Sequence, residues 1–307
     1  MSALAVNGGT PIRTAAWPTW PRPDTAEHAA ELVGEALRSG KWGGDGPMET
    51  EFAEKFAAFQ RAKHGVCVSS GTTALQTAFE AIGIGAGDEV IIPGLTWIAT
   101  ASAVLASNGV PVFADVSRDT FCMDAAAAEA LITPRTRAIV PVHLSGAMTD
   151  MDAIIGVARR HNLIIVEDAA HAHGSLWRCP DGEVRGAGAL GDVGCFSFQA
   201  SKSLTSGEGG VILTNDEALA NRCWAYKNVG RARNEGEENV LGYNFRISEV
   251  QAAVLLAGLE CLDGELATRD ANGMYLNERI GALPGSHPYK HGNPVLCPVW
   301  YRYIFPF

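Results

Sequence analysis

The sequence predicts an α/β fold in which a mostly parallel, seven-stranded sheet carries helices on both faces. Short apolar runs alternate along the chain with segments whose apolar residues recur at helical spacing. The apolar runs lack polar alternation, which is typical of strands that are buried on both sides. Such an alternation of strands and helices favours a doubly wound sheet, with its binding site at the carboxyl ends of the strands.

Seven runs rich in β-branched and other apolar residues are the expected strands. They are Val66–Val68, Val90–Ile92, Val110–Phe113, Ala138–Val142, Leu163–Val166, Val193–Phe198 and Val211–Leu213. Other segments place apolar residues three or four positions apart, and these are the expected helices. They are Thr73–Ala81, Ile98–Ser107, Ala125–Leu131, Met151–Arg160, Glu217–Tyr226 and a long pattern over Ile247–Ile280.

We expect three parts along the chain. Residues 1–46 form an N-terminal arm and helix, residues 47–245 the large α/β domain, and residues 246–307 a linking helix and a small domain. The arm contains the run Trp17–Pro23, which has too many prolines for regular structure. The apolar run Trp300–Phe307 is expected to be a strand with nothing left to pack on it, so we expect an incomplete small domain.

Composition excludes several classes of function. The chain has 307 residues, 47% of them hydrophobic and 19% charged, as in a globular protein with a large core. Its net charge of −10 disfavours binding to nucleic acids and anionic membranes. No apolar run approaches the ~20 residues of a membrane span, and the N-terminus lacks a signal-peptide pattern. The seven cysteines show no C-x-x-C pair, which predicts a reducing cytoplasmic location and no metal site.

A turn of small residues follows the first expected strand. In Ser69-Ser-Gly-Thr-Thr73 the glycine and the threonine after it open a helix. The free N–H groups at such a helix start can bind a phosphate, so Gly71 and Thr72 are candidate ligands. An ordinary Ser/Thr helix cap is the alternative interpretation.

Asp168 and Lys202 are the candidates for chemistry. Asp168 lies at the carboxyl end of an apolar strand, where a partly desolvated carboxylate needs a cationic partner such as a protonated pyridine nitrogen. The alternative is a helix-capping aspartate followed by the surface histidines His171 and His173. Lys202 follows the Val193–Phe198 strand among small hydroxylated residues and glycines, where a desolvated amine suits Schiff-base chemistry. A solvated loop lysine is the alternative there.

Six motifs in this order resemble the DegT/StrS-type sugar aminotransferases, which are enzymes of fold type I that depend on pyridoxal 5'-phosphate (PLP). The motifs lie at Ser69–Leu75, Pro93–Thr100, Pro141–Gly146, Glu167–Gly174, Ser197–Gly210 and Gly242–Arg246. The resemblance runs from Leu4 to the end of the chain. It implies the PLP fold of type I for the predicted sheet.

The resemblance assigns roles around the cofactor ring. It implies that Lys202 forms the Schiff base with PLP and later carries the proton, and that Asp168 keeps the pyridine nitrogen protonated. Trp97 would stack on the ring, with a plain core tryptophan as the alternative. His171 would lie near the phenolic oxygen of the cofactor.

The resemblance also assigns the phosphate contacts. Gly71, Thr72 and Ser197 would bind the phosphate from one chain. Asn244 would reach it from the neighbouring subunit, which implies a homodimer with shared active sites. The alternative for Asn244, read from its polar turn alone, is a residue that merely turns the chain before the long helix.

Within the family the chain looks most similar to glutamine-dependent aminotransferases of ketocyclitols such as scyllo-inosose. The implied reaction moves an amino group from L-glutamine or L-glutamate to a keto-sugar or ketocyclitol in antibiotic or amino-sugar biosynthesis. Related alternatives are a PLP-dependent sugar dehydratase, an enzyme like 3-amino-5-hydroxybenzoate synthase, and a non-catalytic partner that holds PLP. The dehydratases have histidine in place of Lys202. A nucleotide-binding oxidoreductase is disfavoured because its glycine-rich candidate, Gly83–Gly87, precedes a strand.

Overall fold

The computed structural model describes residues 3–21, 25–234, 239–288 and 294–305 of the chain. Residues 22–23 of the expected proline-rich run, and residues 306–307 of the expected final strand, lie outside this part. The division of the chain at residues 46 and 245 stays a prediction.

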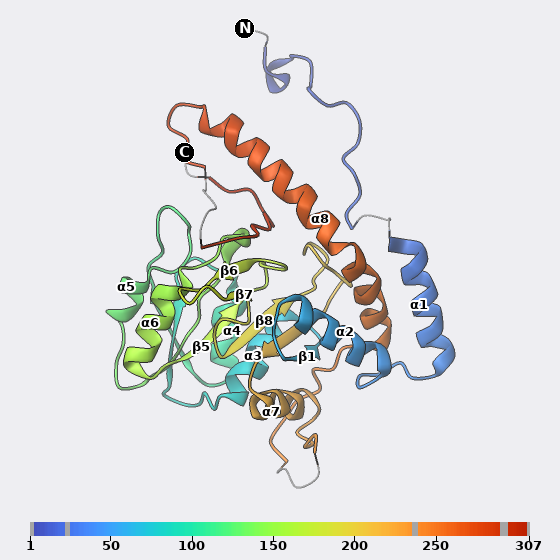
Figure 1. Ribbon diagram of the computed structural model, residues 1–307, viewed down its shortest axis with the longest axis vertical. Helices are drawn as coiled ribbons and strands as arrows, with labels where there is room; N and C mark the ends of the chain where they lie inside the picture. Colours follow the sequence, from blue (N-terminus) through green and yellow to red (C-terminus); the bar gives the residue numbers. More distant parts are fainter. Residues whose placement is uncertain (1–2, 22–24, 235–238, 289–293, 306–307) are drawn as a thin grey trace.

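A seven-stranded sheet forms the centre of the protein, as the sequence predicts, with the strand order β1-β9-β8-β5-β4-β2-β3 (Figure 1). β8, β5, β4, β2 and β3 run parallel, whereas β9 is antiparallel to both β8 and β1. The strands are β1 (His64–Val68), β2 (Glu89–Pro93), β3 (Val110–Ala114), β4 (Thr136–Ile139), β5 (Ile164–Asp168), β8 (Val193–Ser197) and β9 (Gly210–Thr214). Each strand overlaps one of the expected apolar runs.

In every strand of this sheet except β3, successive side chains enter two separate cores, one on each face of the sheet. In β2, for example, Val90 and Ile92 join one apolar cluster while Ile91 joins the other. This two-residue period is the pleat of a strand that is buried on both sides. It explains why the strands read as unbroken apolar runs in the sequence. The expectation of burial on both faces is wrong for the edge strand β3, where Val110 and Phe113 are exposed.

Helices cover both faces. One core is closed by α3 (Gly71–Ala81), α4 (Ile98–Ala106) and α7 (Glu217–Lys227), and the other by α2 (Pro47–Phe59), α6 (Met151–His161) and α8 (Glu249–Gly281). The short α5 (Ala125–Glu129) packs on α6 and β3. α1 (Ala26–Ser39) lies along the N-terminal half of α8 (Figure 1). The structure adds α2 and the hairpin β6 (Leu176–Arg178)–β7 (Val184–Gly186), which the sequence analysis did not predict. The part of the chain that the structure describes also contains the short 3₁₀ turns η1 (Ala5–Asn7) and η3 (Leu144–Gly146).

The expectation of a final strand over Trp300–Phe307 is wrong for the described part of this run. Residues 300–305 form no strand, and Trp300 and Tyr301 are buried against elements that precede them. The Trp300 indole lies on α8 where Gly273 lacks a side chain, since a Cβ there would come within 2.3 Å of the ring. Its Nε1 donates a hydrogen bond of 2.9 Å to Asp270 Oδ1. Apolar residues alone could not distinguish a strand from a coil that docks on a helix.

A buried ion pair joins α2 to the C-terminal end of α7. Lys227 is 1% exposed, and its ammonium group binds the carboxylate of Glu49 and, at 3.3 Å, that of Asp45. The backbone carbonyl of Lys227 accepts a hydrogen bond from Phe245 N at 3.0 Å. Glu249, at the start of α8, accepts hydrogen bonds from the first N–H groups of α2. These contacts fix the segment that carries Asn244.

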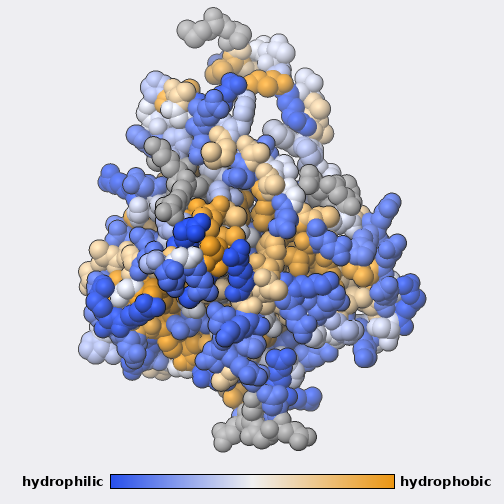
Figure 2. Space-filling view, viewed as in Figure 1, coloured by the Kyte–Doolittle hydropathy of each residue, from blue (hydrophilic) through white to orange (hydrophobic). Residues whose placement is uncertain are grey.

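The surface shown in Figure 2 is hydrophilic over most of its margin, and hydrophobic residues gather near the centre of that face. Within the described residues, none of the helices combines the length and the apolar character that crossing a membrane requires. All seven cysteines are free thiols, and five of them are buried.

We expect Gly273→Ala to lower the melting temperature, because its methyl group would displace Trp300 from α8. The matched control is Gly264→Ala in the same helix, where no atom lies within 4 Å of the added Cβ. That control should stabilise the helix by about 0.5–1 kcal/mol, the usual gain of alanine over glycine. Thermal unfolding followed by tryptophan fluorescence compares the two variants. Equal stabilisation of both would show that Trp300 is not seated on Gly273.

Candidate active site

The predicted site residues lie at the carboxyl ends of the parallel strands. Asp168 ends β5, and Ser197 ends the adjacent β8. Trp97 directly precedes α4, which follows β2 at the same edge of the sheet. Lys202 lies in the loop that joins β8 to β9, and its backbone N–H donates to Gln199 O at 2.8 Å. The topology therefore brings the residues at the carboxyl ends of β2, β5 and β8 to one edge of the sheet.

Asp168 is buried, with 6% of its surface exposed. Its Oδ2 accepts a hydrogen bond from Thr100 Oγ1 at 2.8 Å, and its Oδ1 accepts one from Ala170 N at 3.2 Å. Burial raises the pKa of Asp168, while the hydrogen bond from Thr100 and the positive charge of Lys202 act in the opposite direction. Within the described residues this carboxylate forms no ion pair closer than 4.0 Å, so its charge is held by hydrogen bonds.

The Lys202 amine is suited to act as a nucleophile and a base. Burial lowers the pKa of Lys202 to about 8, and Arg302 adds to this effect while Asp168 opposes it. The amine lies 5.0 Å from the centre of the Tyr301 ring. In a substantial fraction of the protein molecules, the Lys202 amine is therefore neutral near physiological pH. Lys202 is half-buried, which is less exposure than a fully solvated loop lysine would have, and its role stays a prediction.

His173 is buried and His171 is half-buried, so neither is the exposed surface histidine of the alternative interpretation. The His171 ring stacks on Tyr301 with 4.2 Å between the ring centres, and its Nδ1 accepts a hydrogen bond from Ser145 N at 3.2 Å. Burial lowers the pKa of His171 to about 2, so the ring is neutral and its proton sits on Nε2. Burial also lowers the pKa of His173 to about 3, and its Nε2 donates to Ser197 O at 3.0 Å.

The turn before α3 provides a helix start beside the end of β8. Ser70 and Thr73 form a capping box, which leaves the N–H groups of Gly71 and Thr72 ahead of the first helical hydrogen bond. A Cβ on Gly71 would lie 2.6 Å from the Cβ of Ser197, so glycine is required for this close approach. Gly71, Thr72 and Ser197 are therefore placed together, and their phosphate contacts remain predictions.

Trp97 and Asn244 are both exposed in the single chain. Trp97 is 71% exposed, so the alternative of a plain core tryptophan is wrong. Asn244 lies in an exposed turn that pairs with Asn228, and the next residue, Phe245, accepts a hydrogen bond from Ser69 N at 2.8 Å. The roles of Trp97 and Asn244 remain predictions.

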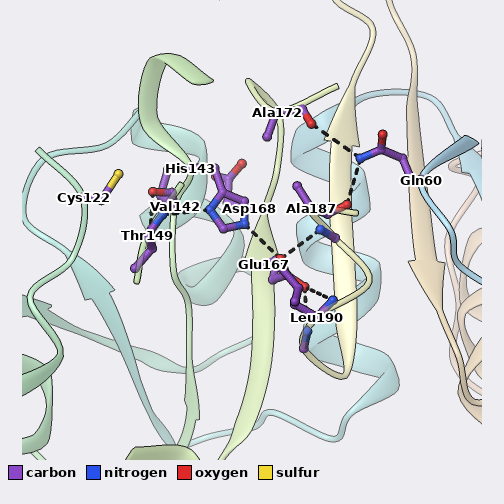
Figure 3. A network of polar contacts seen from close by, with 12 residues as sticks. Gln60, Cys122, Val142, His143, Thr149, Glu167, Asp168, Ala172, Ala187 and Leu190 are labelled. Carbon is purple, nitrogen blue, oxygen red and sulfur yellow. Dashed lines mark hydrogen bonds and ion pairs between the residues drawn. The ribbon is translucent and has the colours of Figure 1, made fainter. Parts of the chain in front are cut away.

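A polar network behind the site was missed by the sequence analysis. Glu167 is fully buried, and its carboxylate accepts hydrogen bonds from the backbone N–H groups of Gly188, Leu190 and Gly191. It also accepts one from Nε2 of His143 at 2.9 Å, whose Nδ1 in turn accepts from Thr149 N (Figure 3). The motif Glu167-Asp168 contained the signal, because neighbouring residues in a strand point to opposite faces.

Thr100 and Tyr301 were also missed as parts of the site. Thr96 and Thr100 lie four positions apart, a spacing that brings two hydroxyl groups onto one side of a helix start. Tyr301 is distant in sequence, and its hydroxyl lies 2.8 Å from Ser201 Oγ. No local signal could have placed it here. Among the described residues, no group of three or more His, Cys, Asp or Glu side chains is arranged to hold a metal ion.

The fold is that of an α/β protein in which one sheet edge carries a lysine with a lowered pKa, a buried carboxylate and the start of a helix. The chain belongs to the DegT/DnrJ/EryC1/StrS aminotransferase family, whose model matches residues 23–305.

Three known proteins illustrate the similarity. An L-glutamine:2-deoxy-scyllo-inosose aminotransferase of Micromonospora echinospora is 47% identical over 92% of this chain and 70% of its own length. The crystal structure of 3-amino-5-hydroxybenzoic acid synthase matches with a TM-score of 0.88 and 33% identity, over 95% of this chain and 76% of that one. The Bacillus subtilis protein NtdA with bound cofactor PMP matches with a TM-score of 0.82 and 30% identity, over 92% of this chain and 63% of that one.

We expect Lys202 in the cofactor-free protein to react with small amine-reactive reagents. Its reaction rate should rise with pH and reach half of its maximum near pH 8, because only the neutral amine is nucleophilic. Reductive methylation at a series of pH values, read by mass spectrometry of peptides, measures this. Lys55 is the internal control, since its contact with Glu51 raises its pKa above the usual value. Asp168→Asn should move the Lys202 midpoint to lower pH, because it removes the charge that favours the ammonium. A midpoint shared with Lys55 would contradict the assignment.

Proposed function

We propose that the protein is a PLP-dependent aminotransferase that moves the amino group of L-glutamine to a ketocyclitol related to 2-deoxy-scyllo-inosose. The observation that carries the proposal is that Lys202, with its lowered pKa, and the buried carboxylate of Asp168 lie at the same edge of the sheet. Family membership supports the reaction type. The 47% identical relative supports the donor and the acceptor.

The residues present fit PLP. Asp168 is a buried carboxylate that lacks an ion-pair partner among the described residues, as a site for a protonated ring nitrogen requires. The start of α3 approaches Ser197 so closely that only glycine is accommodated at Gly71, and its N–H groups suit a phosphate. Lys202 supplies an amine for the cofactor's carbonyl carbon. PMP, bound in the NtdA structure, is the amino form of the same cofactor.

Each residue then has a defined task. When bound, PLP supplies an electron sink that stabilises negative charge on the carbon from which a proton is removed. Asp168 holds the proton of the ring nitrogen, and this maintains the sink. The Lys202 amine takes the proton from the donor carbon and returns it at the cofactor carbon, and the acceptor half-reaction reverses this path. His171 Nε2–H would be available as a donor to the phenolic oxygen of the cofactor, and Trp97 would cover the ring.

A homodimer is part of the proposal. Asn244 is exposed, and the Lys227–Glu49 pair fixes the segment next to it, so its amide is available to a second chain. We propose that Asn244 contacts the phosphate in the partner's site. The seven free cysteines support a reducing compartment, and we propose the cytoplasm.

The proposed reaction is tested by mixing the PLP-loaded protein with each donor, L-glutamine or L-glutamate, and 2-deoxy-scyllo-inosose. We expect an aminocyclitol product by mass spectrometry, with glutamine as the better donor. Lys202→Ala should abolish product while PLP still binds noncovalently, because the phosphate and ring contacts do not depend on this lysine. Borohydride should fix PLP on Lys202 of the unmodified protein.

The outcomes separate the alternatives. Fixation of PLP on another lysine would overturn the site assignment. Dehydrated or aromatised products without amino transfer would support the dehydratase or the hydroxybenzoate synthase alternative. Bound PLP that no amino donor alters would support a non-catalytic PLP-holding protein.

Mixed dimers test the shared site. Lys202→Ala and Asn244→Asp homodimers should both be nearly inactive, the second because a carboxylate repels the phosphate. A mixed dimer contains one doubly damaged site and one intact site. Random mixing makes about half the dimers mixed, so roughly a quarter of all sites should recover. Activity after co-refolding that does not exceed the sum of the separate variants, with subunit exchange verified, would show that Asn244 does not serve the partner.

A further inference from the structure

Two hydroxyl groups lead from the surface of the site to the buried carboxylate. Thr100, in the first turn of α4, is fully buried, and its Oγ1 donates to Asp168 Oδ2 at 2.8 Å. Thr96 precedes the same helix and is half-buried, and its Oγ1 lies 2.8 Å from Thr100 Oγ1. The three residues form a continuous chain of hydrogen bonds.

The direction of this chain follows from the number of protons. A threonine hydroxyl has one proton, and that of Thr100 is directed at the carboxylate. The hydrogen bond between the two threonines must therefore be donated by Thr96 and accepted by Thr100. Both hydroxyl dipoles then point their positive ends toward Asp168. The N-terminus of α4, which carries Thr100, adds a positive partial charge at the same place.

The other groups around Asp168 do not replace this donor. The backbone N–H of Ala170 satisfies the other carboxylate oxygen, Oδ1, at the longer distance of 3.2 Å. Lys202 affects Asp168 through its charge alone. Cys195, its neighbour on β8, is a buried thiol whose pKa is raised well above the usual value, so it is neutral. Among these influences, the hydrogen bond from Thr100 opposes the effect of burial most strongly.

We propose that Thr100 is a positioning residue that keeps Asp168 ionised and aims its free lone pairs into the site, with Thr96 orienting the Thr100 hydroxyl. The inference rests on the proposed function for its consequence, because an ionised Asp168 is what holds a proton on the ring nitrogen of PLP. Without the Thr100 hydroxyl, the proton between Asp168 and the ring nitrogen of PLP moves from the nitrogen toward the carboxylate. The electron sink then weakens although no contact with Lys202 has changed.

The first test needs no cofactor. In protein labelled with ¹³C at the aspartate carboxyl carbons, the Asp168 signal is identified by its loss in Asp168→Asn, and its pKa is measured by titration. Thr100→Val, which keeps the side-chain shape, should raise this pKa by about one unit or more, as expected for loss of a hydrogen bond to a buried charge. Thr100→Ser, which keeps the hydroxyl, should restore most of the wild-type value. Thr96→Val should cause a smaller rise.

The matched control is Ser102→Ala in the same helix. The Ser102 hydroxyl donates to Ile98 O and does not contact the carboxylate, so its removal should leave the Asp168 pKa unchanged. If valine at position 100 prevents folding, Thr100→Ala makes the same test. An unchanged pKa in the folded variant lacking the hydroxyl, or equal shifts in the serine and valine variants, would overturn the proposal.

The second test uses PLP labelled with ¹⁵N in the ring. In the wild-type protein the chemical shift should be that of a protonated nitrogen across neutral pH, and in Thr100→Val it should move toward the unprotonated value. A ring nitrogen signal that Thr100→Val leaves unchanged would show that Thr100 does not control the protonation of the PLP ring. If PLP does not bind at all, the proposed function fails, and the carboxyl titration still decides the role of Thr100.

Discussion

The hydrogen bonds to the buried carboxylate of Glu167 are the interactions around which the site is organised. It collects three backbone N–H groups from the segment before β8, together with the ring of His143. These hydrogen bonds tie β5 to the chain that enters the neighbouring strand. Because side chains alternate along a strand, holding Glu167 on one face of the sheet presents Asp168 to the other. Two adjacent carboxylates are thus buried on opposite faces of the same strand.

The two carboxylates also show how a buried negative charge is maintained in this fold. Neither depends on a salt bridge to lysine or arginine within the described residues. Glu167 is surrounded by N–H donors, and Asp168 has the hydroxyl of Thr100 and one N–H group. Hydrogen bonds of this kind stabilise a negative charge without neutralising it in a salt bridge. Asp168 therefore keeps its capacity to pair with a charged ligand.

Much of the fold could be predicted because the local signals agree with the global arrangement. The strands read as apolar runs because both faces of the sheet are covered, and the order of Gly71, Asp168 and Lys202 follows the strand ends. The errors have a different physical origin. Trp300 and Tyr301 look like strand residues, but their positions depend on a gap at Gly273 and on the ring of His171, which are distant in sequence. The burial of Glu167 was missed although its position next to Asp168 in the strand contained a signal, and its partner His143 had none.

The free cysteines give the protein an internal reporter of its own opening. Cys67 lies in β1, Cys195 in β8 and Cys223 in α7, and burial raises the pKa of each thiol. Such thiols are protected from alkylating reagents while the sheet is closed. Cys261 and Cys297 are exposed, one on α8 and one on the segment that packs beside it, and remain reactive throughout. Slow labelling of the buried thiols therefore reports opening of the sheet, and fast labelling of Cys261 and Cys297 gives the reactivity of an exposed thiol in the same sample.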